Sequence, residues 1–263
     1  MAVQISSSRL ISMEVDGVQN NPVVGIDDAL RKPGSFTSGG ASASRLTDGA
    51  TYTFWTGSGT TNIVYEMDSE QPIDMMAVAA HNIDSSRSVS AQVWDGSSWV
   101  NLAQASSASE TIIWIGNDIT TDRVRFVVTS ASDNAIIGVA FAGRSYTFDQ
   151  RFYQGYNEGR YPTNVDLLTN PSGPHVLGTS VLGKGTSINW SLEHLPEDSV
   201  YGSDFAMFVD HYNKGKGFFA AWRPADYSTA YFGHREGDAI QLPNSGPKRR
   251  KSLEMGMRVY DDY

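Results

Sequence analysis

The stretch that decides the fold is IIGVAFAGRSYTFDQRFYQGYNEGRYP, residues 136–162. It begins as an apolar run typical of the last strand of a buried sheet and continues as a segment rich in aromatic residues, arginine and glycine. The change of texture falls near Gly143. It predicts that one unit ends there and another begins, so we expect a β-sandwich over residues 22–143 and an α+β unit over residues 144–263.

The part before this stretch reads as short strands separated by Ser/Asp/Gly turns. Residues 73–80 form a nearly continuous apolar run, which is typical of a strand buried on both faces. Residues 89–94 alternate between apolar and polar, Asp95-Gly96 turns the chain, and residues 99–102 return, which predicts a hairpin. With further strands expected at 62–67, 111–115, 123–129 and 136–141, and no helical period among them, the pattern predicts a mainly β, antiparallel sandwich.

The part after this stretch contains one segment with a helical pattern. Phe205, Phe208, Val209 and Tyr212 recur at helical spacing, and Gly215 stands where a helix-ending glycine belongs, with Ser203 or Asp204 as the cap. A strand pair over 176–182 and 187–195 turned at 183–185, and strands over 217–222, 229–233 and 253–260, complete an α+β unit with one helix packed on strands. Residues 1–21 predict one or two strands, which can join the C-terminal unit.

Composition excludes several classes of protein. The 263 residues carry a net charge of −9, and the one basic run, residues 248–251, reads as a solvated turn, so we expect no nucleic-acid partner. There is no cysteine, which excludes disulfides and thiolate chemistry. No leader-like start and no apolar run long enough to cross a bilayer is visible, so we expect a soluble product made in a cytoplasm, without membrane insertion.

Motifs for catalysis and metal binding fail on inspection. Residues 178–184 imitate a phosphate-binding loop, but Gly185 stands where the magnesium-binding Ser or Thr is needed, so a glycine-rich turn is the better interpretation. The five histidines show no metal-ligand spacing, and no Gly-x-Ser-x-Gly elbow is present. We therefore expect no enzyme, no cofactor and no metal site, although an active site assembled from distant residues stays open.

Tryptophans are the other candidates for function, because an exposed ring can stack on a sugar or anchor a protein partner. Trp94 and Trp114 occupy strand positions and are expected in the core. Trp55 follows an aromatic neighbour and precedes a Thr/Gly/Ser loop, which makes it the better surface candidate.

Several of these residues together resemble the discoidin, or galactose-binding-like, jelly-roll sandwich over residues 22–143. The resemblance is carried by Leu46-Thr47-Asp48-Gly49 before Phe54-Trp55, by the strands 63–67 and 73–80, by His81-Asn82 directly after them, and by the Trp94-to-Trp99 hairpin. The variant with His-Asn is similar to one in tailed-phage virion proteins. The Ala142-Gly143-Arg144 turn, residues 155–162 and 178–183, and residues 218–224 with Tyr227 and Tyr231 are similar to the second half of those proteins.

The resemblance implies a non-enzymatic structural component of a phage tail, such as a minor tail or tail-tip protein of the virion, that assembles with other tail proteins and with copies of itself in a ring. The alternative is an attachment module for host surface glycans, for which the matching positions are Trp55, His81, Asn82 and Arg87. His81 and Asn82 can instead cap the loop after a buried strand. The aromatic residues expected at assembly contacts, unless they fill the core, are Phe152, Tyr153, Tyr156, Tyr161, Phe218, Phe219, Trp222 and Tyr227.

Overall fold

The computed structural model describes residues 1–108, 111–131, 134–151, 157–158, 163–169, 176–184, 186–226, 229–243 and 251–260, with the backbone alone between 157 and 186. The fold is mainly β with mostly antiparallel pairing, as predicted. Its strands are β1 (Val3–Ile5), β2 (Val23–Ile26), β3 (Gly34–Ser38), β4 (Trp55–Gly57), β5 (Thr60–His81), β6 (Arg87–Trp94), β7 (Trp99–Asn101), β8 (Ile112–Ser130), β9 (Ala135–Thr147), β10 (Asn157–Glu158), β11 (Thr163–Thr169), β12 (Val176–Lys184), β13 (Thr186–Leu195), β14 (Phe218–Ala221), β15 (Ala230–Glu236) and β16 (Lys251–Val259). The α-helices are α1 (Ser7–Val15), α2 (Glu197–Val200) and α3 (Ser203–Asn213), and the 3-10 helices are η1 (Ala29–Arg31), η2 (Ala43–Thr47) and η3 (Pro224–Asp226).

Two long strands build the sandwich by running through both of its layers. β5 and β8 pair on either side of a break in register between Glu66 and Gln71, so the separate strands expected at 62–67 and 73–80 are one bent strand. The first half of β5 and the second half of β8 lie with β3, β6 and β7, whereas the second half of β5 and the first half of β8 lie with β1, β4 and β9. The core between the layers includes Trp55, Trp114 and Phe126.

The second half of β5 is buried on both faces, which confirms the prediction from its continuous apolar run. Met76 and Val78 belong to the sandwich core, whereas Met75 and Ala77 belong to a second core on the opposite face. That second core takes up Met13 of α1 together with residues of β14 and β15. The C-terminal unit therefore packs on the outer face of the layer formed by β1, β9 and the second half of β5, and we call this face the floor.

The C-terminal unit packs α3 against strands over an aromatic core. The predicted helix is confirmed, and Gly215 ends it with a φ of 68°. Its N-cap is Gly202, without a side-chain hydrogen bond, rather than Ser203 or Asp204. Phe208 is fully buried, and five other aromatic side chains surround it: Tyr146, Phe148, Phe205, Tyr212 and Phe218.

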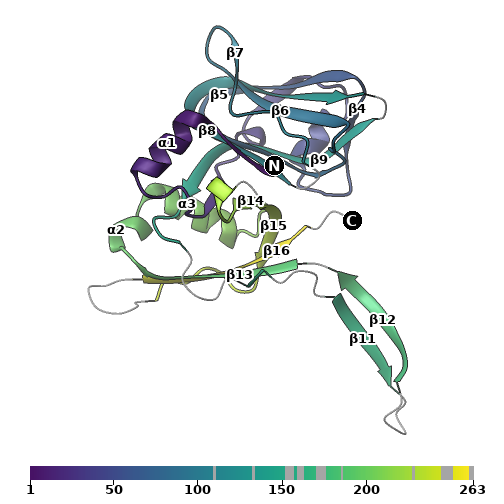
Figure 1. Cartoon of the computed structure of the whole chain (residues 1–263), viewed down its shortest axis with the longest axis vertical. Helices are drawn as coiled ribbons and strands as arrows, with labels where there is room; N and C mark the ends of the chain where they lie inside the picture. Colours follow the sequence, from purple (N-terminus) through teal and green to yellow (C-terminus); the bar gives the residue numbers. More distant parts are fainter. Residues whose placement is uncertain are drawn as a thin grey trace.

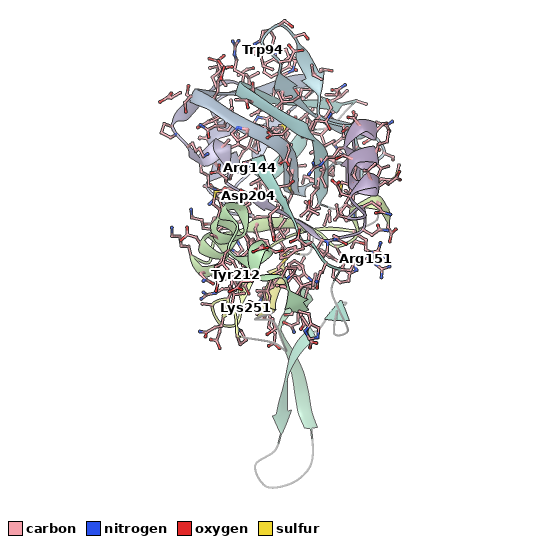
Figure 2. The ribbon with its side chains drawn as sticks, turned by 90° about the vertical axis from the view of Figure 1, so that its left-hand side faces the viewer. Trp94, Arg144, Arg151, Asp204, Tyr212 and Lys251 are labelled. Atoms are coloured by element: carbon pink, nitrogen blue, oxygen red, sulfur yellow. The ribbon has the colours of Figure 1, made fainter. Side chains whose placement is uncertain are left out.

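The two units share one sheet. β2 lies between β9 and β14, so the strand order passes from the sandwich into the C-terminal unit without a gap. In Figure 2, Arg144 and Asp204 meet at this junction, where their side chains form an ion pair at 2.7 Å between β9 and α3. The turn predicted at residues 142–144 is wrong, because β9 continues through it. A Cβ at Gly143 would lie 2.5 Å from the Asp27 carbonyl oxygen, and the missing side chain lets β2 approach.

Three further expectations need correction. Residues 7–15 are a helix capped by the Ser6 side chain, which accepts from the Arg9 N–H, and not a second strand. β1 pairs in parallel with β8 of the sandwich and does not join the C-terminal strands. β12 pairs with β11, whereas β13 pairs with β16 and β10, so the strand pair expected across residues 183–185 does not form. Figure 1 shows β11 and β12 projecting from the body as a two-stranded arm.

A buried carboxylate helps to hold the junction. Asp74 of β5 is 8% exposed and accepts hydrogen bonds from the Ser145 backbone N–H at 2.5 Å and hydroxyl at 2.8 Å, while Arg9 of α1 lies 3.9 Å away. Burial raises the pKa of Asp74 to about 6, against the lowering effect of the Ser145 hydrogen bonds. Burial also raises the pKa of Asp28 to about 6, with Arg31 opposing the shift.

We expect Asp74→Asn to flatten the pH dependence of stability. A carboxyl group whose pKa is raised by folding binds its proton more tightly in the native state, so stability falls as pH rises from about 4 to 6. A shift of about two pKa units corresponds to at most about 3 kcal/mol. Asparagine can keep both contacts to Ser145, so the variant should gain about 1–3 kcal/mol at pH 7.5 and little at pH 4. Thermal unfolding measured from pH 4 to 8 tests this; a slope equal to that of the wild type would contradict it, although Asp28 should preserve part of the slope.

Candidate functional site

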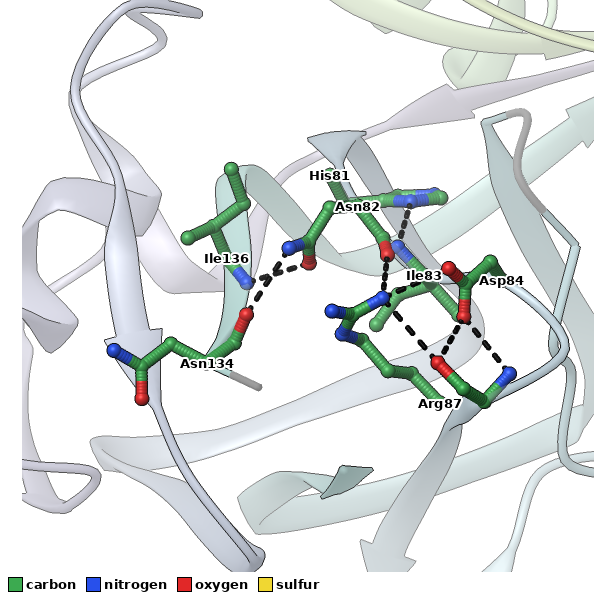
Figure 3. A network of polar contacts seen from close by, with 8 residues as sticks. His81, Asn82, Ile83, Asp84, Arg87, Asn134 and Ile136 are labelled. Carbon is green, nitrogen blue, oxygen red and sulfur yellow. Dashed lines mark hydrogen bonds and ion pairs between the residues drawn. The ribbon is translucent and has the colours of Figure 1, made fainter. Parts of the chain in front are cut away.

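The loop after β5 brings three of the four predicted glycan-site residues together (Figure 3). Ala80, close to the end of β5, has a φ of 54°, which lies in the left-handed region. The Asn82 side chain donates to the Asn134 carbonyl at 3.0 Å and accepts from the Ile136 N–H at 2.8 Å. Asn82 thus closes the gap between this loop and the start of β9.

Neighbouring polar groups in the loop are joined in the same way. Arg87 donates to the Asn82 carbonyl at 3.2 Å and to Asp84 at 2.8 Å. Asp84 accepts from the hydroxyl and backbone N–H of Ser86, and these bonds, with the help of Arg87, lower its pKa. His81 is 6% exposed, and its Nδ1 accepts from the Ile83 N–H at 3.2 Å. These contacts favour the interpretation that the side chains shape the loop.

Trp55 does not belong to this group, and its expected surface position is wrong. Its ring is fully buried in the sandwich core, and its indole N–H donates to the Gly39 carbonyl at 2.7 Å. β4 pairs Trp55 with Ile137 of β9, which turns the ring inward. The ring therefore presents no face to a sugar.

Three of the residues predicted at assembly contacts have described side chains, and two of these three are buried. Phe218 and Phe219 are buried in two different cores on opposite faces of β14, so they are not surface contacts. Trp222 is half-buried against the C-terminal core and borders a hollow of about 270 Å³ with Arg151 and Arg223. The remaining residues of that prediction lie outside the described side chains: Phe152, Tyr153, Tyr156, Tyr161 and Tyr227.

Two half-buried tryptophans of the sandwich lie on the outer face of the layer that contains β6 and β7. Trp94 and Trp99 are cross-strand partners on β6 and β7, both half-buried, with ring centroids 5.5 Å apart and an edge-to-face arrangement. Arg123 lies over the Trp94 ring at 4.9 Å, and Arg125 lies over the Trp99 ring at 4.4 Å. Figure 2 places Trp94 at the end of the molecule opposite the β11–β12 arm.

Amides complete this surface. The Gln92 side chain accepts from Arg125 Nε and donates to the Asn101 side chain at 2.7 Å. Partial burial lowers the pKa of Arg125, which nevertheless remains a cation at neutral pH. We call the group of Gln92, Trp94, Trp99, Asn101, Arg123 and Arg125 the Trp–Arg face.

The hairpin that carries the two rings is fixed by its turn. The Asp95 carboxylate accepts hydrogen bonds from the backbone N–H groups of Ser98 at 2.7 Å and Ser97 at 2.8 Å. These bonds lower the pKa of Asp95 to about 2, and the bond from Ser98 has the largest effect. Gly96 has a φ of 96°, which favours glycine. The rings are therefore presented from a preformed hairpin, which confirms the turn predicted at Asp95-Gly96.

Sequence reasoning placed Trp94 in the core, and this is wrong; Trp114 is buried as predicted. The signal for Trp94 was available in the alternation of β6. Val89, Ala91 and Val93 are fully buried, so Trp94 shares the outward face with Gln92. The partner arginines could not be found this way, because their position opposite β6 depends on the register of β8.

A larger hollow, of about 520 Å³, lies in the C-terminal unit between β13, β16 and the end of β15. Glu236, Asp238 and Glu254 line it, with amides and hydroxyls between them. Among the residues that the structure describes, no side-chain hydrogen bond joins two of its lining groups as a nucleophile and its base would be joined. The described ranges also contain no cluster of three metal-ligating side chains and no helix long and apolar enough to cross a membrane.

Known structures are similar to part of this chain. No protein-family model matches the chain, and no curated protein matches it. Among solved structures it is similar to CpGH89CBM32-6 produced by Clostridium perfringens, at 20% identity over 46% of this chain and 99% of the other, with a TM-score of 0.37. It is also similar to chitosan-binding module 1 derived from chitosanase/glucanase from Paenibacillus sp. IK-5, at 20% identity over 45% of this chain and 99% of the other, with a TM-score of 0.38.

A third match is to a longer protein. The GH29 fucosidase of Ruminococcus gnavus is 15% identical over 39% of this chain and 22% of its own length, with a TM-score of 0.34. These matches cover less than half of the chain, and at such TM-scores we draw nothing about function from them. The resemblance to tailed-phage virion proteins stays a prediction.

Proposed function

We propose that this chain is a non-enzymatic glycan-binding protein and that the Trp–Arg face is its binding surface. The observation that carries the proposal is the pair of half-buried tryptophans held on a tight hairpin at the outer face of the sandwich. The predicted loop site has no aromatic residue, because Trp55 is buried in the core. The Trp–Arg face combines aromatic and polar groups in one place.

The chemistry of this face suits a sugar better than an apolar partner. Saccharides offer C–H patches that pack on aromatic rings and hydroxyl groups that need hydrogen-bond partners. The two rings supply apolar surface, and the side chains of Gln92, Asn101 and Arg125 supply donors and acceptors beside it. Because neighbours already hold these side chains, little conformational entropy is lost when a ligand binds.

We expect the double variant Trp94→Ala/Trp99→Ala to lose at least about tenfold in glycan affinity, equivalent to about 1.4 kcal/mol. The reason is that both stacking surfaces disappear while the sandwich core, to which neither ring belongs, stays intact. A glycan array probed with the full-length chain, followed by calorimetry on the best hit, measures the effect.

Tyr52→Ala is the matched control, because Tyr52 is an 81% exposed aromatic residue between η2 and β4 and lies outside the Trp–Arg face. It should bind like the wild type. If no glycan on the array binds the wild type, the proposed function is lost. If binding survives the double variant, a glycan site lies elsewhere, and Asn82→Ala then tests the loop after β5.

A second candidate function is assembly into a larger structure, as the phage-tail resemblance implies. The observation that favours it is the arm: β11 and β12 form a two-stranded sheet of their own, separate from the sheet that joins the other strands. An isolated two-stranded hairpin is marginally stable in water, so a partner that adds to it would stabilise it. Deletion of residues 163–184 should then abolish assembly, and labelled antibodies should find the chain in the tail of purified virions. A monomeric wild type that is absent from particles would eliminate this candidate.

A further inference from the structure

The two arginines of the Trp–Arg face differ in their charge partners. Arg123 donates from Nε to Asp122 at 3.1 Å, so a neighbouring carboxylate compensates its charge. Arg125 contacts only the neutral Gln92 through Nε, and among the described residues no carboxylate lies within ion-pair distance of it. A partly buried cation beside a neutral amide favours an anion as its next partner.

The position of Arg125 also fixes the geometry of such an anion. Its guanidinium lies over the Trp99 ring, and its Nε is held by Gln92, which in turn is held by Asn101. Among the described residues, the Nη groups of Arg125 donate no hydrogen bond, so they can bind two oxygens of one carboxylate or sulfate. The Trp99 ring beside this guanidinium offers apolar surface to a sugar.

The net charge of the chain bears on how an acidic ligand can bind. The chain carries a net charge of −9, so an acidic ligand is repelled at long range. At physiological salt this repulsion is screened beyond about 8 Å, whereas a contact to Arg125 is shorter than that. An acidic ligand can therefore bind where a cation is held in place, and the Trp–Arg face provides one.

We propose that the ligand of the Trp–Arg face is an acidic glycan, whose carboxylate or sulfate group is bound by Arg125 while a sugar ring lies against Trp99. This inference rests on the proposed function and names its ligand class. It predicts that affinity depends on the charge of the glycan, and that Arg125 contributes more to binding than Arg123 does.

The test compares three probes on the full chain: a neutral galactose oligosaccharide, an oligogalacturonate and a chondroitin sulfate oligosaccharide. Arg125→Gln should weaken binding of at least one acidic probe by about tenfold or more and change the affinity for the neutral probe less than threefold. Arg125→Lys keeps the charge but loses the planar guanidinium, so its affinity for the acidic probe should lie between those of the wild type and Arg125→Gln. Arg123→Gln should cost less than Arg125→Gln. The uronate and sulfate arms identify which anion is bound.

Arg223→Gln is the control, because Arg223 is an exposed arginine on the C-terminal unit paired with Asp226. It should leave binding unchanged. If the neutral probe binds through Trp94 and Trp99 while both acidic probes fail, the inference is wrong and the proposed function stands. If all three probes fail and the wider array shows no other hit, the proposed function itself is lost. Equal losses from Arg125→Gln for neutral and acidic probes would also overturn the inference.

Discussion

Trp55→Ala is expected to lower the free energy of unfolding by about 3–5 kcal/mol, as large-to-small changes of buried tryptophan do. The ring is fully buried, and space around it is already filled: a Cβ at Gly57 would lie 2.4 Å from two of its carbon atoms. Loss of the ring would leave a cavity and would remove the donor to the Gly39 carbonyl. Urea denaturation followed by circular dichroism measures the change.

The same variant separates stability from binding. Glycan affinity per folded molecule should stay at the wild-type value, because Trp55 lies in the core and the Trp–Arg face lies on the outer sheet face. Trp55→Phe is the matched control, which keeps most of the ring and should recover more than half of the lost stability. A stable alanine variant that no longer binds glycan would show that Trp55 serves the ligand after all.

Phe208→Ala is expected to cost a similar 3–5 kcal/mol. Phe208 lies at the centre of the aromatic core of the C-terminal unit, with ring centroids of five aromatic neighbours between 5.6 and 6.4 Å away. Two of these neighbours, Tyr146 and Phe148, lie in or directly after β9, so the cavity would also loosen the junction with the sandwich. Aromatic pairs add about 0.5–1.5 kcal/mol beyond burial, which the alanine variant also loses.

Tyr201→Ala is the control for this second variant, because Tyr201 lies close to the same helix but is 65% exposed. Its midpoint in urea should differ little from that of the wild type. If Phe208→Ala shifts the midpoint no more than Tyr201→Ala does, the aromatic core does not stabilise the unit as described. A single transition observed at 222 nm and by tryptophan fluorescence would show that both units unfold together.

Local patterns predicted much of the fold. The alternation in β6, the Asp95-Gly96 turn, the doubly buried run in β5 and the period of α3 all depend on residues close in sequence. The predictions that were wrong concern strands that pair with partners distant in the sequence. The position of β2 between β9 and β14 joins residues separated by more than a hundred positions, and no local pattern encodes that neighbourhood.

The candidate site shows the same division. Trp94 could have been placed outward from the parity of its strand, whereas a loop-flanked Trp55 gives no parity to follow, and only the pairing with Ile137 turns it inward. The polar loop of His81 and Asn82 was foreseen as a group, and its structural interpretation is the one that the contacts favour. The position of Arg125 over Trp99 depends on the registers of three strands at once.

The insertion of β2 between β9 and β14 bears on how this chain can be dissected in the laboratory. A recombinant piece that stopped at Gly143 would lack the four residues of β9 that pair with β2, and it would bare the apolar floor formed by Met75, Ala77 and Phe141. An unpaired strand edge beside an exposed apolar face pairs with other chains, and the protein aggregates. Such a piece would fail in solution for reasons unrelated to its ligand, so binding is best measured on the undivided polypeptide.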